Sequence, residues 1–497
     1  MVNNLLYIIL AMFAAVPVVY LLGKSMGKNV SWLVFLVFLG VTISVGMMFP
    51  AMEHETYLEE YAWVSTPVNL TFGLLADGLS VPMLFTYIFV FAGATMFSMP
   101  YMQKRLALDD IEESNEQYAR YYSLFLAYGA SVGGCMLATN MIQFFMFFEM
   151  ALIFSWLLVF LFGYGDRKKN SMIYFIYTHI GGGIFLLGVL GAFWSIGSFN
   201  IADLIHIVDY PNAFWIGFAL TIGLLFKIGA FGFHGWMPST YSESPAPLSA
   251  VLGATSVMLS TYSMARLLPY FQTVLEPISG IIMLWALVTI LYAGVMALAQ
   301  KDTKKLVAYL SMSQMNYCVL GVFTYVAYGV LGSISYSISH GLAIGLLFLV
   351  SGALLYRTGS RDMTEMGGLA EKLPIVILAS LAGFLTIGGV PPAVGFKSKF
   401  ILLSGAMVRG FSSGQLELIV AILAGTVATL LTLGYEFRAV WKIFYGKLPK
   451  KLEDVKSVPL EMAIPLLALG ALTILFGIWP ALITNPIEVF IEHLFHH

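Results

Sequence analysis

Long apolar runs recur along the entire chain. Fourteen can be counted in 497 residues, and most are close to the roughly 20 apolar residues that a helix needs to cross a bilayer. Only 10% of the residues are charged, against about 25% in soluble domains. The sequence predicts an all-α polytopic membrane protein of about 14 transmembrane helices. The predicted spans are 5–22, 31–49, 78–100, 121–138, 141–163, 171–196, 213–236, 248–268, 279–299, 307–325, 328–356, 375–405, 415–437 and 459–482.

Positive charge alternates between the segments that join these runs. One set holds 20 of the 25 Lys and Arg residues, whereas the opposite set holds only Arg409 and includes the acidic stretch AMEHETYLEE (51–60). Basic loops of membrane proteins stay on the cytoplasmic side. We therefore expect a multi-pass protein of the cell membrane with its basic loops in the cytoplasm and both termini outside.

Four basic residues remain inside the apolar runs: Lys227, Arg266, Lys397 and Lys399. Glu149 is the clearest acidic residue in such a run. Placing an ionisable group at bilayer depth costs about 2.5–3.5 kcal/mol or more. Each of these residues is therefore a candidate for function.

The two cysteines, Cys135 and Cys318, stand alone within apolar runs. No CxxC pair, His/Cys cluster or haem-attachment sequence accompanies them. Isolated cysteines of this kind usually behave as small buried hydrophobic residues. We expect no metal or other cofactor and no catalytic or redox centre in this chain. The net charge of −2 argues neither for nor against nucleic acid, and no nucleic-acid partner is expected.

Two apolar runs contain helix-breaking residues. Proline removes a backbone donor, and the carbonyls it frees need protein or water partners at membrane depth. Interrupted helices at corresponding places in two halves of a transporter indicate an ion site. The seventh run is broken by Gly229, Gly232, Gly235, Pro238, Pro245 and Pro247, and the twelfth by Gly388, Gly389, Pro391, Pro392 and Gly395.

Six motifs follow one another along the chain: ADGLS (76–80), FFEM (147–150), FKIGAFGFHGWMPSTYSESPAPLSA (226–250), ALAQKDTKKLVAYLSMSQMNY (297–317), SHGLAIGLLFLVSG (339–352) and GGVPPAVGFKSKF (388–400). Their order and spacing resemble the antiporter-like membrane subunits shared by respiratory complex I, Mrp cation/proton antiporters and membrane-bound hydrogenases. The resemblance covers about residues 70–445. In length the chain most resembles the D-type Mrp subunit and its hydrogenase counterpart.

The resemblance implies a division of the chain around two inverted five-helix repeats, spans 4–8 and 9–13, with helices 7 and 12 broken. The repeats would occupy residues 121–270 and 279–440. Residues 1–120 would hold helices 1–3, and residues 459–497 would hold helix 14 and a short outer tail. Other membrane subunits of an antiporter or respiratory complex would be the partners.

The resemblance also pairs Lys227 with Glu149. Burial disfavours the charged form of lysine, whereas a nearby carboxylate favours it, so a movable carboxylate could set the proton affinity of Lys227. The alternative is a static ion pair, although such pairs are weak evidence for stability. Lys399 matches the terminal lysine or glutamate beside the exit route. Lys397 is about 200° away on a helix and is expected to extend toward a water-filled surface.

Two histidines are further candidates for a proton relay. His340 matches the family's eleventh-helix histidine, and histidine changes charge near neutral pH; alternatively it packs against a serine. His234 could serve the relay or satisfy the carbonyls of the broken helix. Glu243, close to the first break, is expected to be a cap or an interfacial group.

Two positions depart from the family pattern. Met258 or Leu259 stands where the eighth helix usually has a lysine, and Ile344 stands at a usual lysine position of the eleventh helix. Hydroxyl side chains abound in both helices. They could line a file of water molecules or bond back to their own helices. Both a full channel and a half-channel that responds to a neighbouring subunit therefore remain open. The hydroxyl residues are Thr255, Ser256, Ser260, Thr261, Tyr262, Ser263, Ser333, Ser335, Tyr336, Ser337 and Ser339.

The sequence favours an ion-translocating subunit that moves protons, with sodium as a candidate coupled ion, inside a multi-subunit membrane complex. A non-pumping structural or coupling subunit of the same family is the main alternative. A self-contained solute carrier of another family is a weaker alternative. A quinone or redox enzyme is weaker too, because no ligand set for a metal or dinucleotide is visible. The host complex, the ion and the direction of transport are left open.

Overall fold

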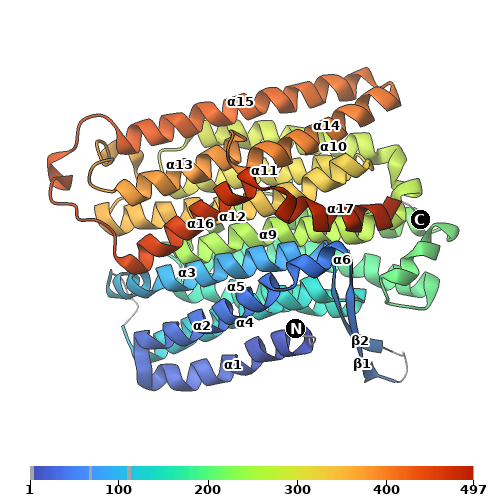
Figure 1. The fold of residues 1–497 in the computed structure, drawn as a ribbon, viewed down its shortest axis with the longest axis horizontal. Coiled ribbons are helices and arrows are strands. Elements are labelled where there is room, and N and C mark those ends of the chain that lie inside the picture. The colour runs from blue at the N-terminus through green and yellow to red at the C-terminus, as the bar shows by residue number, and fades with distance from the viewer. Residues whose placement is uncertain (1–4, 66–69, 109–112, 496–497) are drawn as a thin grey trace.

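The computed structural model describes residues 5–65, 70–108 and 113–495. Helices dominate this part of the chain and run roughly along the longest axis of the molecule (Figure 1). The elements are α1 (Leu5–Met26), α2 (Val30–Gly46), β1 (Tyr57–Val64), β2 (Leu70–Ala76), α3 (Ser80–Leu108), α4 (Asn115–Leu137), α5 (Met141–Phe162), α6 (Arg167–Ile196), α7 (Ala213–Ile228), α8 (Met237–Glu243), α9 (Ala246–Leu267), α10 (Gln272–Ala299), α11 (Thr303–Val322), α12 (Ala327–Thr358), α13 (Pro374–Gly388), α14 (Val394–Ser413), α15 (Leu416–Phe444), α16 (Leu460–Ile478) and α17 (Ala481–Phe495).

The apolar runs of the sequence are helices in the structure. Each predicted span contains helix, and eight of the described helical stretches are long and apolar enough to cross a membrane. Two of these stretches contain more than one helix, and α7 and α13 are shorter apolar helices. The chain is therefore a helical, multi-pass membrane protein, while the number of fourteen crossings stays a prediction.

The expectation of an all-α fold is wrong at one place. β1 and β2 form an antiparallel hairpin in which Tyr57 pairs with Ala76 and Tyr61 with Phe72. The strands lie between two apolar runs, where span counting expects only a loop. The Glu59 carboxylate on β1 accepts the backbone N–H groups of Leu5 at 2.7 Å and Leu6 at 3.1 Å. This contact places a negative charge at the amino end of α1, where it is favourable.

The predicted short outer tail is also different. α17 covers most of it and packs against α12 and α3. The α1–α2 turn and the loop after α15 lie at one end of the bundle, and the β1–β2 hairpin lies toward the other (Figure 1). We call the first the basic end, defined by Lys24, Lys104, Arg167, Lys301 and Arg361. Residues 1–4 and 496–497, which carry the predicted outside position of the termini, lie outside the described residues.

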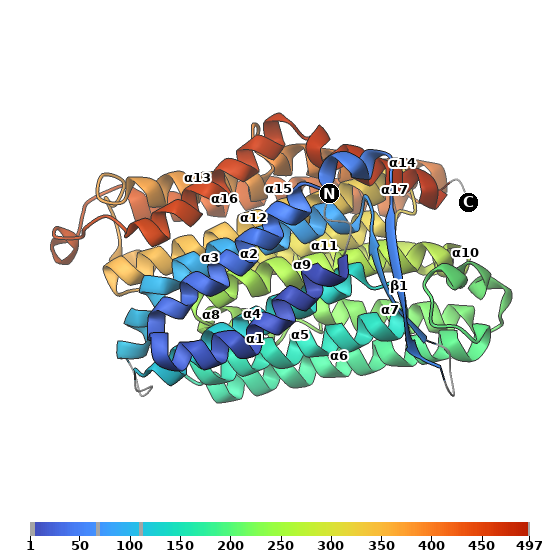
Figure 2. The same cartoon turned by 60° about the horizontal axis from the view of Figure 1, so that its bottom comes forward.

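The centre of the molecule is formed by α9 and α12. Every residue of α9 is buried, and α12 contacts α3, α9, α11, α13 and α14. Helix α6 lies along an outer edge of the bundle, whereas α9, α11 and α12 run through its middle (Figure 2). Cys135 and Cys318 are both buried free thiols.

Both predicted helix breaks are present, and some of the predicted residues make them. α7 ends at Gly229, whose φ of 71° is left-handed, and α13 is followed by Gly389 with a φ of 69°. Glycine adopts this conformation without the steric cost that a Cβ brings. Pro391 and Pro392 lie within the second break, as expected. Three prolines expected to interrupt the seventh helix instead start new helices, because proline is tolerated where the first backbone donors are unpaired. They are Pro238 in the first turn of α8, Pro245 as the N-cap of α9 and Pro247 in its first turn.

Candidate functional site

Lys227 lies in the last turn of α7, directly before the first break. Its side chain is buried, and the amine lies 4.6 Å from the ring centroid of Phe148 on α5. A cation over an aromatic face is attracted by the ring quadrupole. The ammonium is therefore held by a weak contact in an apolar setting.

Glu149 of α5 lies near this lysine but does not contact it directly. Its Oε2 is 2.9 Å from Nδ1 of His179 on α6, and no ion pair joins Glu149 to Lys227 within the described residues. The carboxylate is close enough to act on the ammonium electrostatically. The expected ion pair between Lys227 and Glu149 is therefore not formed directly. The Glu149 carboxylate is instead hydrogen-bonded to His179.

Glycines of α6 create the space for this arrangement. A Cβ added at Gly182 would overlap Oε1 of Glu149, and one at Gly181 would overlap the Cβ of Phe226 on α7. Small residues let membrane helices approach closely. They let α6 pack closely against the Glu149 carboxylate of α5 and against Phe226 of α7, the residue before Lys227.

Lys399 of α14 occupies a similar position after the second break. Its amine donates to the Ile387 carbonyl at 2.8 Å and lies 4.8 Å from the ring centroid of Tyr317 and 5.4 Å from that of Tyr336. Lys399 is buried and Lys397 is exposed, as the helical angle between them predicts.

Glu436 of α15 is the acidic neighbour of Lys399. It is buried, acts electrostatically on the lysine, and neither of its oxygens has a hydrogen-bond partner among the residues described. A Cβ at Gly388 would lie 2.6 Å from its Oε2. A buried lysine, a helix break, a nearby carboxylate and a glycine that leaves room for it thus occur twice, and the carboxylate is fully buried only in the second site.

His340 of α12 is fully buried. In the sequence it lies between Lys227 and Lys399. Its Nε2 is 3.4 Å from Oγ of Ser311, and its Nδ1 has no partner in the part of the chain that the structure describes. The packed-histidine alternative accounts for one ring nitrogen. The other nitrogen could accept or donate a proton if water reached it.

The positions of the two missing lysines are filled by close apolar packing. The Met258 side chain would overlap a Cβ added at Gly341, and Ile344 would overlap one added at Gly253. The contact between α9 and α12 is therefore tight where the family pattern has charged side chains.

Five of the hydroxyl groups expected to line α9 and α12 bond back to their own helices, as Thr255 does to Val251 at 2.7 Å and Ser339 does to Ser335 at 2.8 Å. Three hydroxyl oxygens in these helices are buried and have no partner among the described atoms. Buried polar groups in proteins are usually satisfied by protein or ordered water. The three are Ser260, Thr261 and Ser335.

His234 contacts the broken backbone and a ring on α10. Its Nδ1 accepts the backbone N–H of Gly232 at 3.2 Å, and its ring lies 5.0 Å from that of Tyr292 on α10. This geometry fits the alternative in which His234 bonds to the backbone of the broken helix. The bonded group is the Gly232 N–H and not a carbonyl.

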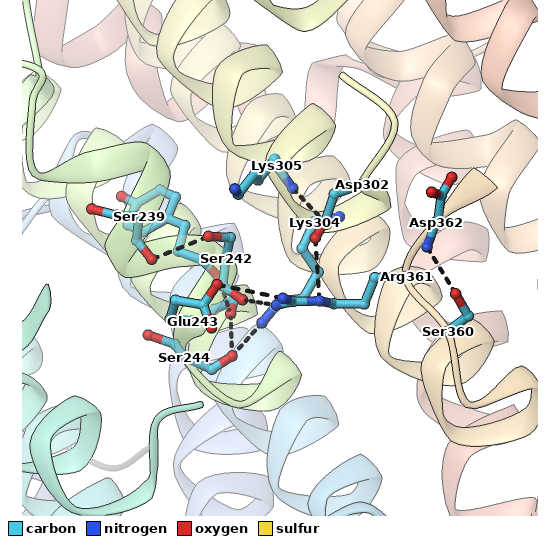
Figure 3. Close-up of polar contacts among 12 residues, drawn as sticks. Ser239, Ser242, Glu243, Ser244, Asp302, Lys304, Lys305, Ser360, Arg361 and Asp362 are labelled. Atoms are coloured by element: carbon cyan, nitrogen blue, oxygen red, sulfur yellow. Dashed lines mark hydrogen bonds and ion pairs between the residues drawn. The ribbon is translucent and has the colours of Figure 1, made fainter. Parts of the chain in front are cut away.

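A polar cluster joins α8 to the second half of the chain at the basic end (Figure 3). Arg361 donates to the Ser242 carbonyl at 2.8 Å and lies 3.4 Å from Glu243 and 3.2 Å from Asp302. Lys304, also buried, donates to the Ser244 carbonyl. Glu243 is thus an ion-pair partner rather than a cap, and Lys304 is not an exposed loop residue. The cluster anchors the segment that follows the first break.

The opposite end contains a buried ion pair. Asp77, outside the membrane-spanning helices, accepts two bonds from Arg266 of α9, at 2.6 Å and 2.9 Å. Burial alone would raise the pKa of Asp77. The Arg266 charge and the hydrogen bonds to the carboxylate outweigh this effect, so the pKa lies below the usual value for Asp. Arg266 is accordingly a paired residue, and Asp77 stays ionised at neutral pH.

Sequence reasoning missed three of these residues. Glu436 could have been found by the rule that found Glu149, since it also lies inside a predicted span. His179 lies in the sixth span and Asp77 in the ADGLS motif, but nothing in the sequence shows that they bond to Glu149 and Arg266.

The fold and these buried charges define a multi-pass membrane protein of the antiporter-like type. Residues 138–432 match the family described as NADH:quinone oxidoreductase/Mrp antiporter, TM. The chain belongs to this family. It is 30% identical to F(420)H(2) dehydrogenase subunit M of Methanosarcina mazei, with 96% of this chain and 94% of that protein covered. It is 28% identical to NADH-quinone oxidoreductase subunit M of Rhodobacter capsulatus, with 95% and 91% covered.

Solved structures share the fold. A chain of respiratory complex I from Thermus thermophilus superposes with a TM-score of 0.84 at 23% identity and covers 99% of both chains. A chain of the Mrp complex from Dietzia sp. superposes with a TM-score of 0.83 at 20% identity, with 98% of this chain and 97% of that chain covered. The architecture is therefore that of antiporter-like subunits.

Proposed function

We propose that the chain is an ion-translocating subunit of a multi-subunit membrane complex and that it moves protons. The observation that carries this proposal is the repeated site: Lys227 near Glu149 and Lys399 near Glu436, each lysine beside a broken helix. A buried ammonium loses its proton when a carboxylate moves away and regains it when the carboxylate approaches. Sodium is a candidate coupled ion, since antiport is a property of the family.

The proposed route begins at the first break, where water can satisfy the open backbone and reach Lys227. The proton then passes His340 and the unpaired hydroxyl groups of α9 and α12. It arrives at Lys399, which donates to the open carbonyl of Ile387 at the second break. Movement of the Glu149 carboxylate, driven by a neighbouring subunit, sets the proton affinity at the start of this route.

The names of the relatives support a host complex of the quinone oxidoreductase or Mrp type. In such a complex the basic end would face the cytoplasm and both termini would lie outside. Two inverted units, 121–270 and 279–440, would each carry one lysine site, between the helices of 1–120 and those of 459–497. Other membrane subunits and the lipid bilayer would be the immediate partners.

A second candidate function, that of a non-pumping coupling subunit, is favoured by one observation. Apolar packing of Met258 against Gly341 and of Ile344 against Gly253 closes the centre between α9 and α12. Under this alternative the lysine sites would respond to neighbours without completing a channel.

Glu149→Gln and Lys399→Ala test the proposal, with the exposed Lys397→Ala as a matched control. Coupled ion translocation is measured in the complex that copurifies with the chain, reconstituted in vesicles. Both site variants should lower it at least about tenfold, because a shift of one pKa unit changes a proton affinity tenfold. Glu149→Gln alters the proton affinity of Lys227, and Lys399→Ala removes a proton acceptor. Lys397→Ala should leave translocation unchanged. Normal translocation in both buried-site variants, with assembly intact, would favour the coupling role.

A further inference from the structure

The bond between His179 and Glu149 joins an exposed imidazole to a nearly buried carboxylate. Nδ1 of His179 is 2.9 Å from Oε2 of Glu149, and the side chains are 58% and 15% exposed. The imidazole stacks on Phe175, with ring centroids 5.2 Å apart and planes 9° apart. The ring is therefore held in the orientation that reaches the carboxylate.

The other carboxylate oxygen is left without a bond. Oε1 of Glu149 faces Gly182 and has no hydrogen-bond partner in the described structure. The Lys227 amine lies over the Phe148 ring and also feels the charge of Glu149. One carboxylate thus acts on two nitrogen bases and is bonded to one of them.

Few other titratable groups act on Glu149. They are Lys227 of α7, the Cys135 thiol of α4 and the Tyr174 phenol of α6. Elsewhere around α6, Glu243 of α8 pairs with Arg361 at the basic end. Asp203, in the turn after α6, accepts a hydrogen bond from Ser198. The competition for Glu149 is therefore between His179 and Lys227.

We propose that His179 is a positioning residue that competes with Lys227 for the Glu149 carboxylate and makes ion translocation depend on pH. This inference rests on the proposed function of Lys227. When the imidazole is protonated, its bond to the carboxylate is charge-assisted and about twice as strong as a neutral one. Glu149 is then withheld from Lys227, and the lysine cannot recover its proton. When the imidazole is neutral, the carboxylate is free to approach Lys227.

The test compares His179→Gln, His179→Leu and the matched control His206→Gln, which changes an exposed histidine away from the site. Coupled translocation by the copurifying complex in vesicles is measured across pH 5–8, the range in which histidine charge changes. Assembly is monitored by copurification, and Lys227→Ala is included to test the underlying function separately.

The wild type and His206→Gln should lose translocation on the acidic side of the profile. His179→Gln keeps a neutral hydrogen bond to the carboxylate and should retain the neutral-pH rate while losing the acidic decline. His179→Leu releases the carboxylate to form a permanent pair with Lys227, so the rate should fall about tenfold across the range, as expected for one charged hydrogen bond.

An acidic decline in His179→Gln equal to that of the wild type, or the absence of a decline in the wild type, would overturn the proposal. Wild-type rates in His179→Leu would also overturn it. If His179→Leu does not assemble, the pH profile of His179→Gln decides. Loss of translocation in Lys227→Ala together with an unchanged His179→Gln profile would reject only this inference, whereas translocation by Lys227→Ala would reject the proposed function itself.

Discussion

At the scale of single residues, the structure separates two kinds of buried charge. The Asp77–Arg266 pair is bonded twice and closed. Lys227 and Lys399 instead lie near carboxylates that keep unpaired oxygens in the described structure. A closed pair fixes two charges in place, whereas an open pair leaves the charge of the lysine adjustable. The open pairs are the sites that suit translocation.

Asp77→Asn should therefore destabilise the protein without acting on the lysine sites. Removing one partner of a buried ion pair leaves the other charge uncompensated, at a cost of about 3–5 kcal/mol. Thermal unfolding in detergent measures the effect. Glu116→Gln is the control, since it removes an exposed pair with Arg120 and should change stability by less than about 1 kcal/mol. Equal stability of the two variants would contradict the structural role of the pair.

The sequence predicts the buried ionisable residues but not the partners they bond to. An ionisable residue in an apolar run is visible without a structure, and this rule found Glu149, Lys227 and Lys399. The partners are not visible in this way, because His179 reaches Glu149 only through the packing of α5 against α6. The same holds for Lys304. Its sequence position predicts an exposed loop residue, whereas in the structure it is buried.

At the scale of elements, the short helix α8 is the part of the first break most firmly attached to the second half. Its carboxyl end accepts bonds from Arg361 and Lys304, which lie on the α12–α13 connection and on α11. Helix carboxyl ends leave carbonyls unpaired and attract cations. The cluster therefore connects the segment beside Lys227 to elements of the half that holds Lys399.

Lys304→Met should loosen α8. It removes the buried amine near Glu243 and Asp302, and with it the hydrogen bond to the Ser244 carbonyl, a loss of about 1–3 kcal/mol. Hydrogen exchange of residues 237–244 should accelerate about tenfold. Lys305→Met changes the adjacent exposed lysine and should leave exchange unchanged. Equal exchange in both variants would show that the cluster does not hold α8.

The breaks themselves follow from glycine and proline in apolar runs, and the sequence predicted both. It did not predict which residues end one helix and which begin the next, because proline suits a first helical turn as well as a break. It also missed β1 and β2. Their alternating pattern occupies only a few residues between two apolar runs, where span counting expects a loop.

At the scale of the whole molecule, apolar run length is enough to establish a helical multi-pass membrane protein. The relation between the two lysine sites is not contained in that pattern. It depends on α9 and α12, which are packed tightly against each other between them. Under the proposed function, protons therefore pass between the Lys227 and Lys399 sites by way of the few unpaired polar atoms along these helices.

Coupled ion translocation by the Lys227→Ala variant is the most direct test of this account. The variant is purified with its copurifying subunits, reconstituted in vesicles and compared with the wild type and Lys397→Ala. Positioned proton-transfer groups contribute about a hundredfold or more to rate, so the account predicts a loss of that order in Lys227→Ala and none in Lys397→Ala. A wild-type rate in a fully assembled Lys227→Ala complex would contradict it.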